Sequence, residues 1–525
     1  MIDTLRYDRL GISGYRPDLT PTLNWLARNG IHFTRMYAQA PSTQMVFPCI
    51  HSSTYPLDYN GYNDGMKDRP WSAAEVLKAN GYQTYAYMGM PVGRYQYANR
   101  GFDQFYNFYD FRNLISQIIK RDFLHYYRLS DSNPAESENT FEILKSRAAA
   151  MFDALIQDYE TNEPQFHYPF VKRRNRRYME RLKRERDLFN KDPEATLRKI
   201  KTLGPDHFIN FLGVSKVPRL RLLWYRALNF CFYTTSSLLR KTIGFWSLRR
   251  SHADAEVLNH NTQQLLTGEV KPPFFIYVHY CDIHEGQKLH DRADVKRIFR
   301  GGRIFLKEAS WRAYQGDYAY DFALGAVDRD IGKFLSFLKT SGWLKNSILV
   351  INGDHGDGRE TSFPRRRPTL INRFHREFLH IPFTIYHEGV EPQVIEKLCG
   401  QADVFPTLFD LVGVESPKEF IGRSMLKDER KYVISEAADS GNCDLSRRVL
   451  SFTITDEKFK LIAHLKGDVL EPAAFYDLER DPWEMNNLVE DDRYRDAMDE
   501  RQRIIYEERV KPIRAEHPFM GLVEA

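Results

Sequence analysis

Two short, continuously apolar runs constrain the fold more than any other feature of the sequence. They span residues 274–278 and 348–352 and are rich in β-branched and aromatic side chains. Strands that are buried on both faces have this composition, and such strands are typical of parallel sheets covered by helices. Between them, residues 320–338 place apolar side chains at helical spacing. The pattern predicts an α/β fold with a mostly parallel central sheet flanked by helices, whose ligands gather at the carboxyl ends of the strands.

The N-terminal region repeats this alternation of helices and strands. Thr20 is placed as an N-cap, Pro21 at the first helical position and Gly30 as the end of a helix. Ser72 and Glu75 have the spacing of a capping box, and a strand is expected at residues 82–87. These signals support the α/β prediction.

The chain is too long for a single ordinary core, which predicts appended pieces. Residues 111–259 are basic and aromatic and are predicted to form a helical insertion. Residues 448–454 and 458–462 alternate between apolar and polar side chains, so 431–525 are predicted to hold a small antiparallel sheet subdomain. Residues 1–110 and 260–430 remain as the main domain, which is predicted to carry the α/β sheet.

Charge narrows the expected partners. The insertion is dense in Lys and Arg at 172–186, which favours a solvated charged helix, with peripheral contact to a membrane or anionic polymer through 170–250 as the alternative. A net charge of +5 suits an anionic substrate but is too small to indicate nucleic-acid binding. No apolar run is long enough for a membrane-spanning helix, and five scattered cysteines favour a reducing compartment. We therefore expect a cytoplasmic or membrane-peripheral location.

Metal-compatible side chains follow two of the expected strands. Asp3 follows a two-residue apolar stub, and Asp354 and His355 follow the run at 348–352. Such oxygen and nitrogen ligands fit a divalent cation, with Mn²⁺, Mg²⁺, Zn²⁺ and Ca²⁺ in falling order of preference. Taken alone, an Asp-His pair is more often a helix cap and a surface histidine. A strand before Asp3 requires about four more residues, so the natural reading frame is expected to extend upstream.

Nucleophilic and acid–base groups lie at two further places. Thr43 stands at the expected start of a helix, where free N–H groups favour anions, although such residues are usually caps. Asp282 and His284 would share one face if the strand from residue 274 continued through them. A histidine just past that strand can protonate a departing oxygen.

Several motifs in this order resemble the sulfatase family of the alkaline phosphatase superfamily. The matching segments are Thr20-Pro21-Thr22-Leu23, Gly81-Tyr82-Gln83-Thr84, Pro273-Phe274-Phe275, Gly353-Asp354-His355-Gly356, Asp403-Val404-Phe405-Pro406 and Phe475-Tyr476-Asp477-Leu478. The resemblance implies that Asp3, Thr43, Asp354 and His355 bind one divalent metal ion. It also implies that Thr43 is the nucleophile and that His284 contacts the ester or its leaving group.

The sequence departs from the sulfatase pattern at the nucleophile. Sulfatases carry Cys or Ser followed by x-Pro-Ser-Arg, whereas this chain has Thr43-Gln44-Met45-Val46-Phe47, and threonine cannot be oxidised to formylglycine. A threonine nucleophile is similar to that of phosphoethanolamine and phosphoglycerol transferases, which favours a phosphate over a sulfate ester. The alternatives are a sulfuric ester hydrolase proper, or a non-catalytic scaffold that binds a glycan or a membrane.

The substrate is expected to be an anionic ester, linked to a glycan or a lipid. The lysine and histidine with which the family holds its substrate are absent, because Gly89-Met90-Pro91-Val92 stands in their place. The basic groups that follow the metal pair are expected to replace them: Arg365, Arg366, Arg367 and His375. Together with Asp282, Arg367 and His375 are the predicted substrate-binding residues.

Overall fold

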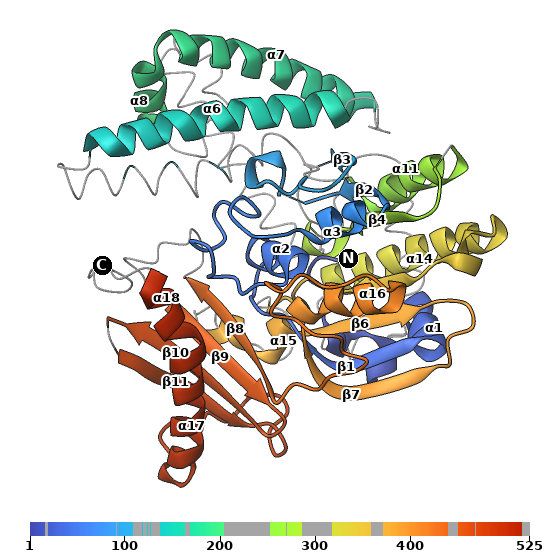
Figure 1. The fold of residues 1–525 in the computed structure, drawn as a ribbon, viewed down its shortest axis with the longest axis vertical. Coiled ribbons are helices and arrows are strands. Elements are labelled where there is room, and N and C mark those ends of the chain that lie inside the picture. The colour runs from blue at the N-terminus through green and yellow to red at the C-terminus, as the bar shows by residue number, and fades with distance from the viewer. Residues whose placement is uncertain are drawn as a thin grey trace.

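The fold was examined in a computed structural model of the 525-residue chain (Figure 1). The structure describes residues 1–15, 19–90, 92–108, 137–162, 169–203, 253–268, 270–285, 318–358, 371–438, 450–467 and 469–516, together with 118, 123 and 127.

The central sheet has two blocks of strands joined through the first residues of the chain. One block has the order β3 (Gln104–Asn107), β2 (Gln83–Met88) and β4 (Phe274–His279), all parallel. The other has the order β5 (Leu349–Asn352), β6 (His380–Tyr386), β1 (Ile31–Tyr37) and β7 (Gln393–Gly400). Ile2 bridges both blocks, since it pairs in parallel with Tyr280 and with Gly353. Among these strands β6 alone runs antiparallel to its neighbours. The predicted mostly parallel sheet is therefore confirmed.

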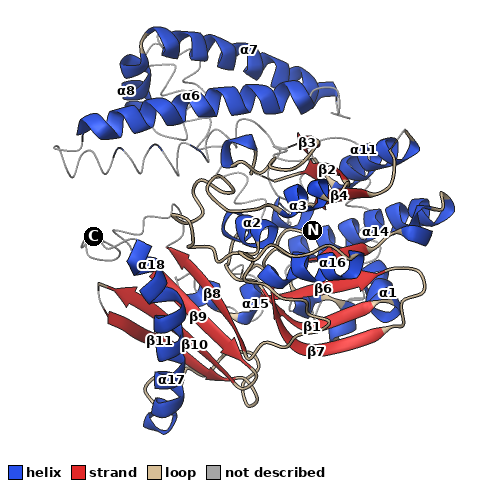
Figure 2. Ribbon diagram, in the orientation of Figure 1, coloured by secondary structure: helices blue, strands red, loops and turns tan. Residues whose placement is uncertain are grey.

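Helices cover both faces of the sheet (Figure 2). α1 (Pro21–Asn29), α11 (Ala255–Thr267) and α14 (Tyr318–Thr340) contribute to one apolar cluster with β2 and β5. α2 (Thr43–Ser52), α3 (Ala73–Ala79) and α16 (Val404–Val412) contribute to a second cluster with β1 and β6. Burial on both faces explains why the strands are continuously apolar.

One helix cap differs from the sequence prediction. The capping box of Ser72 and Glu75 is present at α3, but the Thr20 side chain does not cap α1. The carboxylate of Asp328, on α14, accepts hydrogen bonds from the N–H groups of Thr22 at 3.1 Å and Leu23 at 2.9 Å. A partner about 300 residues away satisfies these donors, which local sequence spacing does not reveal.

The predicted C-terminal sheet is present and antiparallel. Its order is β11 (Val469–Asp477), β10 (Phe459–Lys466), β9 (Leu450–Asp456) and β8 (Tyr432–Ala438). α17 (Arg495–Ile505) packs on it and leads through a π-helical turn, Tyr506–Val510, into α18 (Lys511–Glu516). The apolar side chains of this C-terminal sheet belong to the same cluster as those of β1 and β6, so the two sheets share a core.

The described part of the insertion is helical, as predicted. α6 (Ser137–Asn162), α7 (Pro169–Lys191) and α8 (Pro193–Leu203) have an apolar cluster of their own and lie at the top of Figure 1. Asp158 of α6 forms a 2.9 Å ion pair with Arg94, which ties the insertion to the main domain. Residues 204–250 of the predicted contact surface lie outside the described residues. Within the described residues, no helix combines the length and apolarity needed to span a membrane.

Candidate active site

Three segments that are far apart in the sequence converge at the carboxyl edge of the central sheet. Asp3 follows the bridge at Ile2, between the ends of β4 and β5, and its N–H donates to the Tyr280 carbonyl at 2.9 Å. Asp354 and His355 follow β5 directly. Because parallel strands end at the same edge, these residues face Thr43 at the start of α2.

The Thr43 hydroxyl lies at the centre of this group. Its Oγ1 donates to Asp3 Oδ1 at 3.3 Å and lies 3.2 Å from His355 Nε2. His355 Nε2 is also 3.5 Å from Asp3 Oδ1 and 3.6 Å from Asp354 Oδ2. All four side chains are buried. The structure thus brings together the four residues predicted to bind a metal, while their metal binding itself stays a prediction.

The two carboxylates differ in their proton affinity. Burial, reinforced by the charge of Asp354, raises the pKa of Asp3 to about 6. Burial alone would also raise the pKa of Asp354, but His355 and His279 hold it below its ordinary value. Asp354 Oδ1 accepts from the N–H groups of Thr4 at 2.9 Å and His355 at 2.6 Å. The pair therefore concentrates negative charge that a cation would compensate.

A divalent cation fits this group of donors. Asp354 Oδ2 is buried and has no hydrogen-bond partner among the described residues, so it is available as a ligand. His355 Nδ1 lies 2.6 Å from the Gly356 carbonyl. If Nδ1 carries the proton, that contact orients the ring and leaves Nε2 as the metal-binding nitrogen. Asp3, Asp354 and His355 offer ligand atoms that all lie within 4.8 Å of one another.

The turn that carries Asp354 and His355 is held from several sides. The Gln401 amide donates to the carbonyls of Gly353 and Asp354. The Arg6 guanidinium, which is buried, donates to the Asp357 carbonyl at 2.9 Å. Gly356 has no room for a side chain, because a Cβ there would lie 1.9 Å from the Glu377 carbonyl oxygen. Close packing of backbone against backbone therefore fixes the turn.

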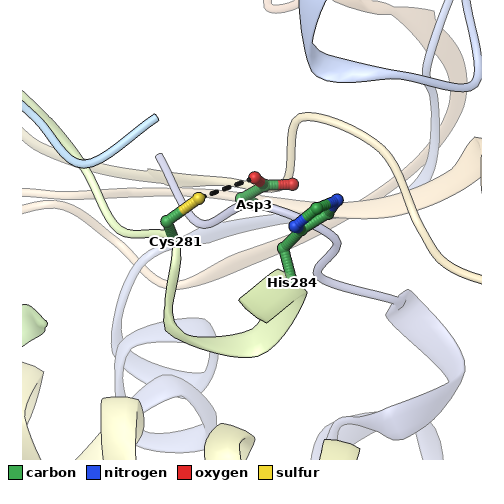
Figure 3. Close-up of side chains that lie close together, drawn as sticks. All are labelled: Asp3, Cys281 and His284. Carbon is green, nitrogen blue, oxygen red and sulfur yellow. Dashed lines mark hydrogen bonds between the residues drawn. The ribbon is translucent and has the colours of Figure 1, made fainter. Parts of the chain in front are cut away.

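Asp282 and His284 do not share a face, which corrects the expectation from strand spacing. β4 ends at His279, and residues 282–285 form one helical turn, α12 (Asp282–Glu285), on which positions two apart diverge. Asp282 is buried, and its Oδ1 accepts from the Ala255 N–H at 3.2 Å. His284 is exposed and lies beside Asp3 and Cys281 (Figure 3). His284 is thus positioned beside the cluster on its solvent side, and substrate contact by Asp282 stays a prediction.

The other predicted substrate-binding residues are not part of this cluster. His375 is buried, and its Nε2 lies 2.9 Å from the hydroxyl of Tyr476, in the packing between α15 (Arg376–Leu379) and the C-terminal sheet. Arg365, Arg366 and Arg367 lie outside the described residues. Substrate binding by Arg367 and His375 therefore stays a prediction.

Two residues of the site were missed by sequence reasoning. His279, the last residue of β4, has its Nε2 3.9 Å from Asp354 Oδ2, and its Nδ1 lies 2.9 Å from the Tyr277 hydroxyl. Cys281 donates a 3.1 Å hydrogen bond to Asp3 Oδ2. Burial, followed by the charge of Asp3, raises the pKa of this thiol well above its ordinary value. Their position at the carboxyl end of a buried strand was the available signal.

Two family profiles and several curated proteins match the chain. The sulfatase family profile matches residues 1–414, and that of the N-sulphoglucosamine sulphohydrolase C-terminal region matches 372–511. The Δ4,5-hexuronate-2-O-sulfatase of Bacteroides thetaiotaomicron is 27% identical over 210 residues, 38% of this chain and 41% of the relative. The chain spans about two fifths of the length of the first curated relatives it matches.

Solved structures show the same fold over nearly the whole chain. A 2-O GAG sulfatase superposes with a TM-score of 0.56 at 15% identity, covering 99% of this chain and 92% of that one. The phosphonate monoester hydrolase of Agrobacterium radiobacter gives 0.56 at 16% identity, covering 98% and 95%. At this identity the likeness establishes the fold alone.

Proposed function

The chain belongs to the sulfatase family, and from this membership we propose that it is a metal-dependent hydrolase or transferase of phosphate or sulfate esters. The Thr43 hydroxyl is its nucleophile. The observation that carries the proposal is the position of Thr43 Oγ1, 3.3 Å from Asp3 Oδ1 and 3.2 Å from His355 Nε2. A hydroxyl beside two such groups, at the start of a helix, is placed both to lose its proton and to attack an anionic centre.

The reaction begins with Thr43. Its Oγ1 forms a bond to phosphorus or sulfur while the bond to the ester oxygen opposite breaks. The hydroxyl proton leaves toward Asp3 Oδ1, to which it is already hydrogen-bonded. His284, exposed at the edge of the cluster, donates a proton to the departing oxygen. Water then releases the covalent threonine ester in a hydrolase, and an acceptor hydroxyl does so in a transferase.

The cation site contributes charge. Asp3, Asp354, His355 and the Thr43 oxygen would hold one divalent ion, and an ion bound there stabilises the threonine oxyanion and the non-bridging oxygens of the ester. The N-terminus of α2 adds a partial positive charge at the same place, because its first N–H groups have no partner within the helix.

The nucleophile favours phosphoester over sulfate chemistry. A threonine lacks the oxidisable side chain from which the aldehyde of the usual sulfatase mechanism is made, and direct attack by an alkoxide is ordinary phosphoryl-transfer chemistry. Sulfuric ester hydrolysis is the second candidate, because the curated relatives are named as sulfatases. The fold supports both, since the structural neighbours include a sulfatase and a phosphonate monoester hydrolase.

The proposed substrate is an anionic ester linked to a glycan. Relatives and neighbours whose names specify a hexuronate or a GAG support this class. A lipid-linked ester is the alternative, with peripheral membrane contact through the insertion. On α7, Lys183 forms an ion pair with Glu160 and Arg186 with Asp153 at 3.5 Å, both acidic partners on α6. The charges of these two basic side chains are compensated within the protein, so they do not by themselves favour contact with a membrane.

Replacement of the nucleophile tests the proposal. Thr43→Ala should lower turnover by at least about 10³-fold while leaving the bound metal, measured by mass spectrometry, close to that of the wild type. Ser42→Ala is the matched control, because this neighbouring hydroxyl makes no capping hydrogen bond. Nitrophenyl sulfate, phosphate, phosphodiester and phosphonate esters assayed side by side identify the reaction. Retained turnover in Thr43→Ala would exclude Thr43 as the nucleophile.

A non-catalytic scaffold makes the opposite prediction. Such a protein would bind its glycan or membrane without holding a cation at Asp3, Asp354 and His355. Purification of the full chain without metal, combined with no turnover of any ester in the panel after metal is added, would favour this alternative.

A further inference from the structure

The two oxygens of the Asp3 carboxylate face different groups of donors. Oδ1 faces Thr43 and His355, whereas Oδ2 accepts a 3.1 Å hydrogen bond from Cys281 Sγ. In Figure 3 the Cys281 side chain and the His284 ring flank the Asp3 carboxylate. The ligand atoms of Asp3, Cys281 and His284 all lie within 4.8 Å of one another. We propose that these three residues form a second cation site, bridged to the first by Asp3, for a thiophilic divalent cation such as Zn²⁺.

The spacing of the three donors is close to that of a tetrahedral site. Zn²⁺ binds carboxylate oxygen, imidazole nitrogen and thiolate sulfur at about 2.0 to 2.3 Å, which places the donor atoms of a tetrahedron roughly 3.3 to 3.8 Å apart. Cys281 Sγ and Asp3 Oδ2 are 3.1 Å apart, slightly closer than this range. His284 belongs to a short helical turn and is exposed, and its ligand nitrogen lies within 4.8 Å of the other two donor atoms.

The chemical nature of the donors separates the two sites. The first site has oxygen and imidazole donors only, and these suit Mg²⁺, Mn²⁺ or Ca²⁺ as well as Zn²⁺. A thiolate donor selects softer cations, above all Zn²⁺ and Co²⁺. Three protein ligands with a fourth position directed to the exposed side of His284 match the pattern of catalytic rather than structural zinc.

A bridging carboxylate would hold two cations at the separation used by two-metal enzymes, about 3.5 to 4 Å. The imidazole of His284 has two ring nitrogens, so one can bind the second cation while the other still faces the substrate. The Cys281 thiol proton is released to solvent when the cation binds. The inference shares Asp3 and His284 with the proposed function, and the following experiment separates their outcomes.

Cobalt substitution of the full chain provides a direct test. The protein is stripped with a chelator and reloaded with Co²⁺ in the absence of oxygen. Thiolate coordination gives Co²⁺ an intense near-ultraviolet charge-transfer absorption that oxygen and nitrogen ligands do not give. The wild type should bind two Co²⁺ per chain and show this band. Cys281→Ala should bind one and lose the band.

Two further variants keep the test decisive. Cys399→Ala removes a different buried thiol, on β7, whose Sγ donates to the Lys397 carbonyl, and it should keep the band and both ions. His284→Ala changes an exposed side chain, so it tests the site even if Cys281→Ala fails to fold, and it should lose one Co²⁺. One Co²⁺ per chain in the wild type, or a band that persists in Cys281→Ala, overturns the second site. Turnover retained in Thr43→Ala overturns the proposed nucleophile but leaves the metal stoichiometry unchanged.

Discussion

The buried ion pair between Lys460 and Glu484 links the C-terminal sheet to the turn that carries Asp354 and His355. Lys460 Nζ lies 3.0 Å from Glu484 Oε1, and the two side chains are 0% and 2% exposed. Glu484 Oε2 accepts from the Arg376 N–H at 3.0 Å, at the start of α15. One turn further, the Phe378 carbonyl accepts from the Gly356 N–H at 2.6 Å, directly beside the histidine of the proposed metal site. A change at the pair should therefore affect both stability and metal binding.

The expected magnitude follows from the burial of both charges. Removing one partner leaves the other charge buried without this counter-charge, so Lys460→Met or Glu484→Gln should each cost about 3–5 kcal/mol. The double variant removes both charges and should recover most of that loss. An unfolding entropy of about 2.1 cal/mol/K per residue gives roughly 1.1 kcal/mol/K for the whole chain, hence a lowering of Tm by about 3–5 °C. If the C-terminal subdomain unfolded alone, the shift would be several-fold larger.

Calorimetry of the metal-loaded and the chelator-treated protein measures this effect for the two single variants and the double variant. Burial alone would raise the pKa of Glu484, but the Lys460 charge holds it below its ordinary value. The stabilisation by Glu484 is thus present above the unfolded pKa of about 4.5 and is lost as pH falls through the lower folded value. The difference between the wild type and Glu484→Gln should therefore narrow in acid. A double variant as unstable as the sum of the single variants would refute the argument.

Two further predictions concern the same edge of the sheet. Gly356→Ala should weaken metal binding by at least about tenfold, because its Cβ would lie 1.9 Å from the Glu377 carbonyl oxygen and displace the turn. Gly325→Ala is the control, because the nearest atom to its Cβ would be 3.7 Å away. Equal metal affinity in the two variants would contradict the prediction. Burial alone would raise the pKa of Asp8, but the Arg6 guanidinium lowers it to about 2. At pH values above the unfolded pKa of 3.8, Asp8 therefore stabilises the fold by about 2 kcal/mol. This contribution is lost as the pH falls toward 2. The urea unfolding midpoints of the wild type and Asp8→Asn should therefore converge as the pH falls through this range. A difference between the two midpoints that does not change with pH would argue against the stabilising role of Asp8.

The architecture was largely predictable because its signals are local. Continuous apolar runs identify β4 and β5, and apolar spacing identifies α14, since burial on both faces or on one stripe determines which residue types are tolerated. The cap of α1 was not predictable, because its acceptor is Asp328 from a distant helix. Contacts that depend on tertiary packing leave no local pattern in the sequence.

The active site was predicted in part, for a related reason. Asp3, Thr43 and Asp354 converge as expected, because residues that follow parallel strands meet at one edge of the sheet. The relation of Asp282 to His284 was wrong because it assumed that the strand continued, whereas β4 ends at His279. A change from strand to helical turn within three residues alters the direction of every following side chain.

The proposed role of Thr43 as the nucleophile explains why the surroundings of Asp3 matter. A threonine hydroxyl is a poor nucleophile at neutral pH and needs strong electrostatic activation. The site places Thr43 between a carboxylate and an imidazole in a buried setting, where a cation acts at a low effective dielectric. A second cation near the other oxygen of Asp3 would add positive charge close to the Thr43 oxygen and would further stabilise its alkoxide. The Cys281 side chain would then act on Thr43 through Asp3, to which both residues donate hydrogen bonds.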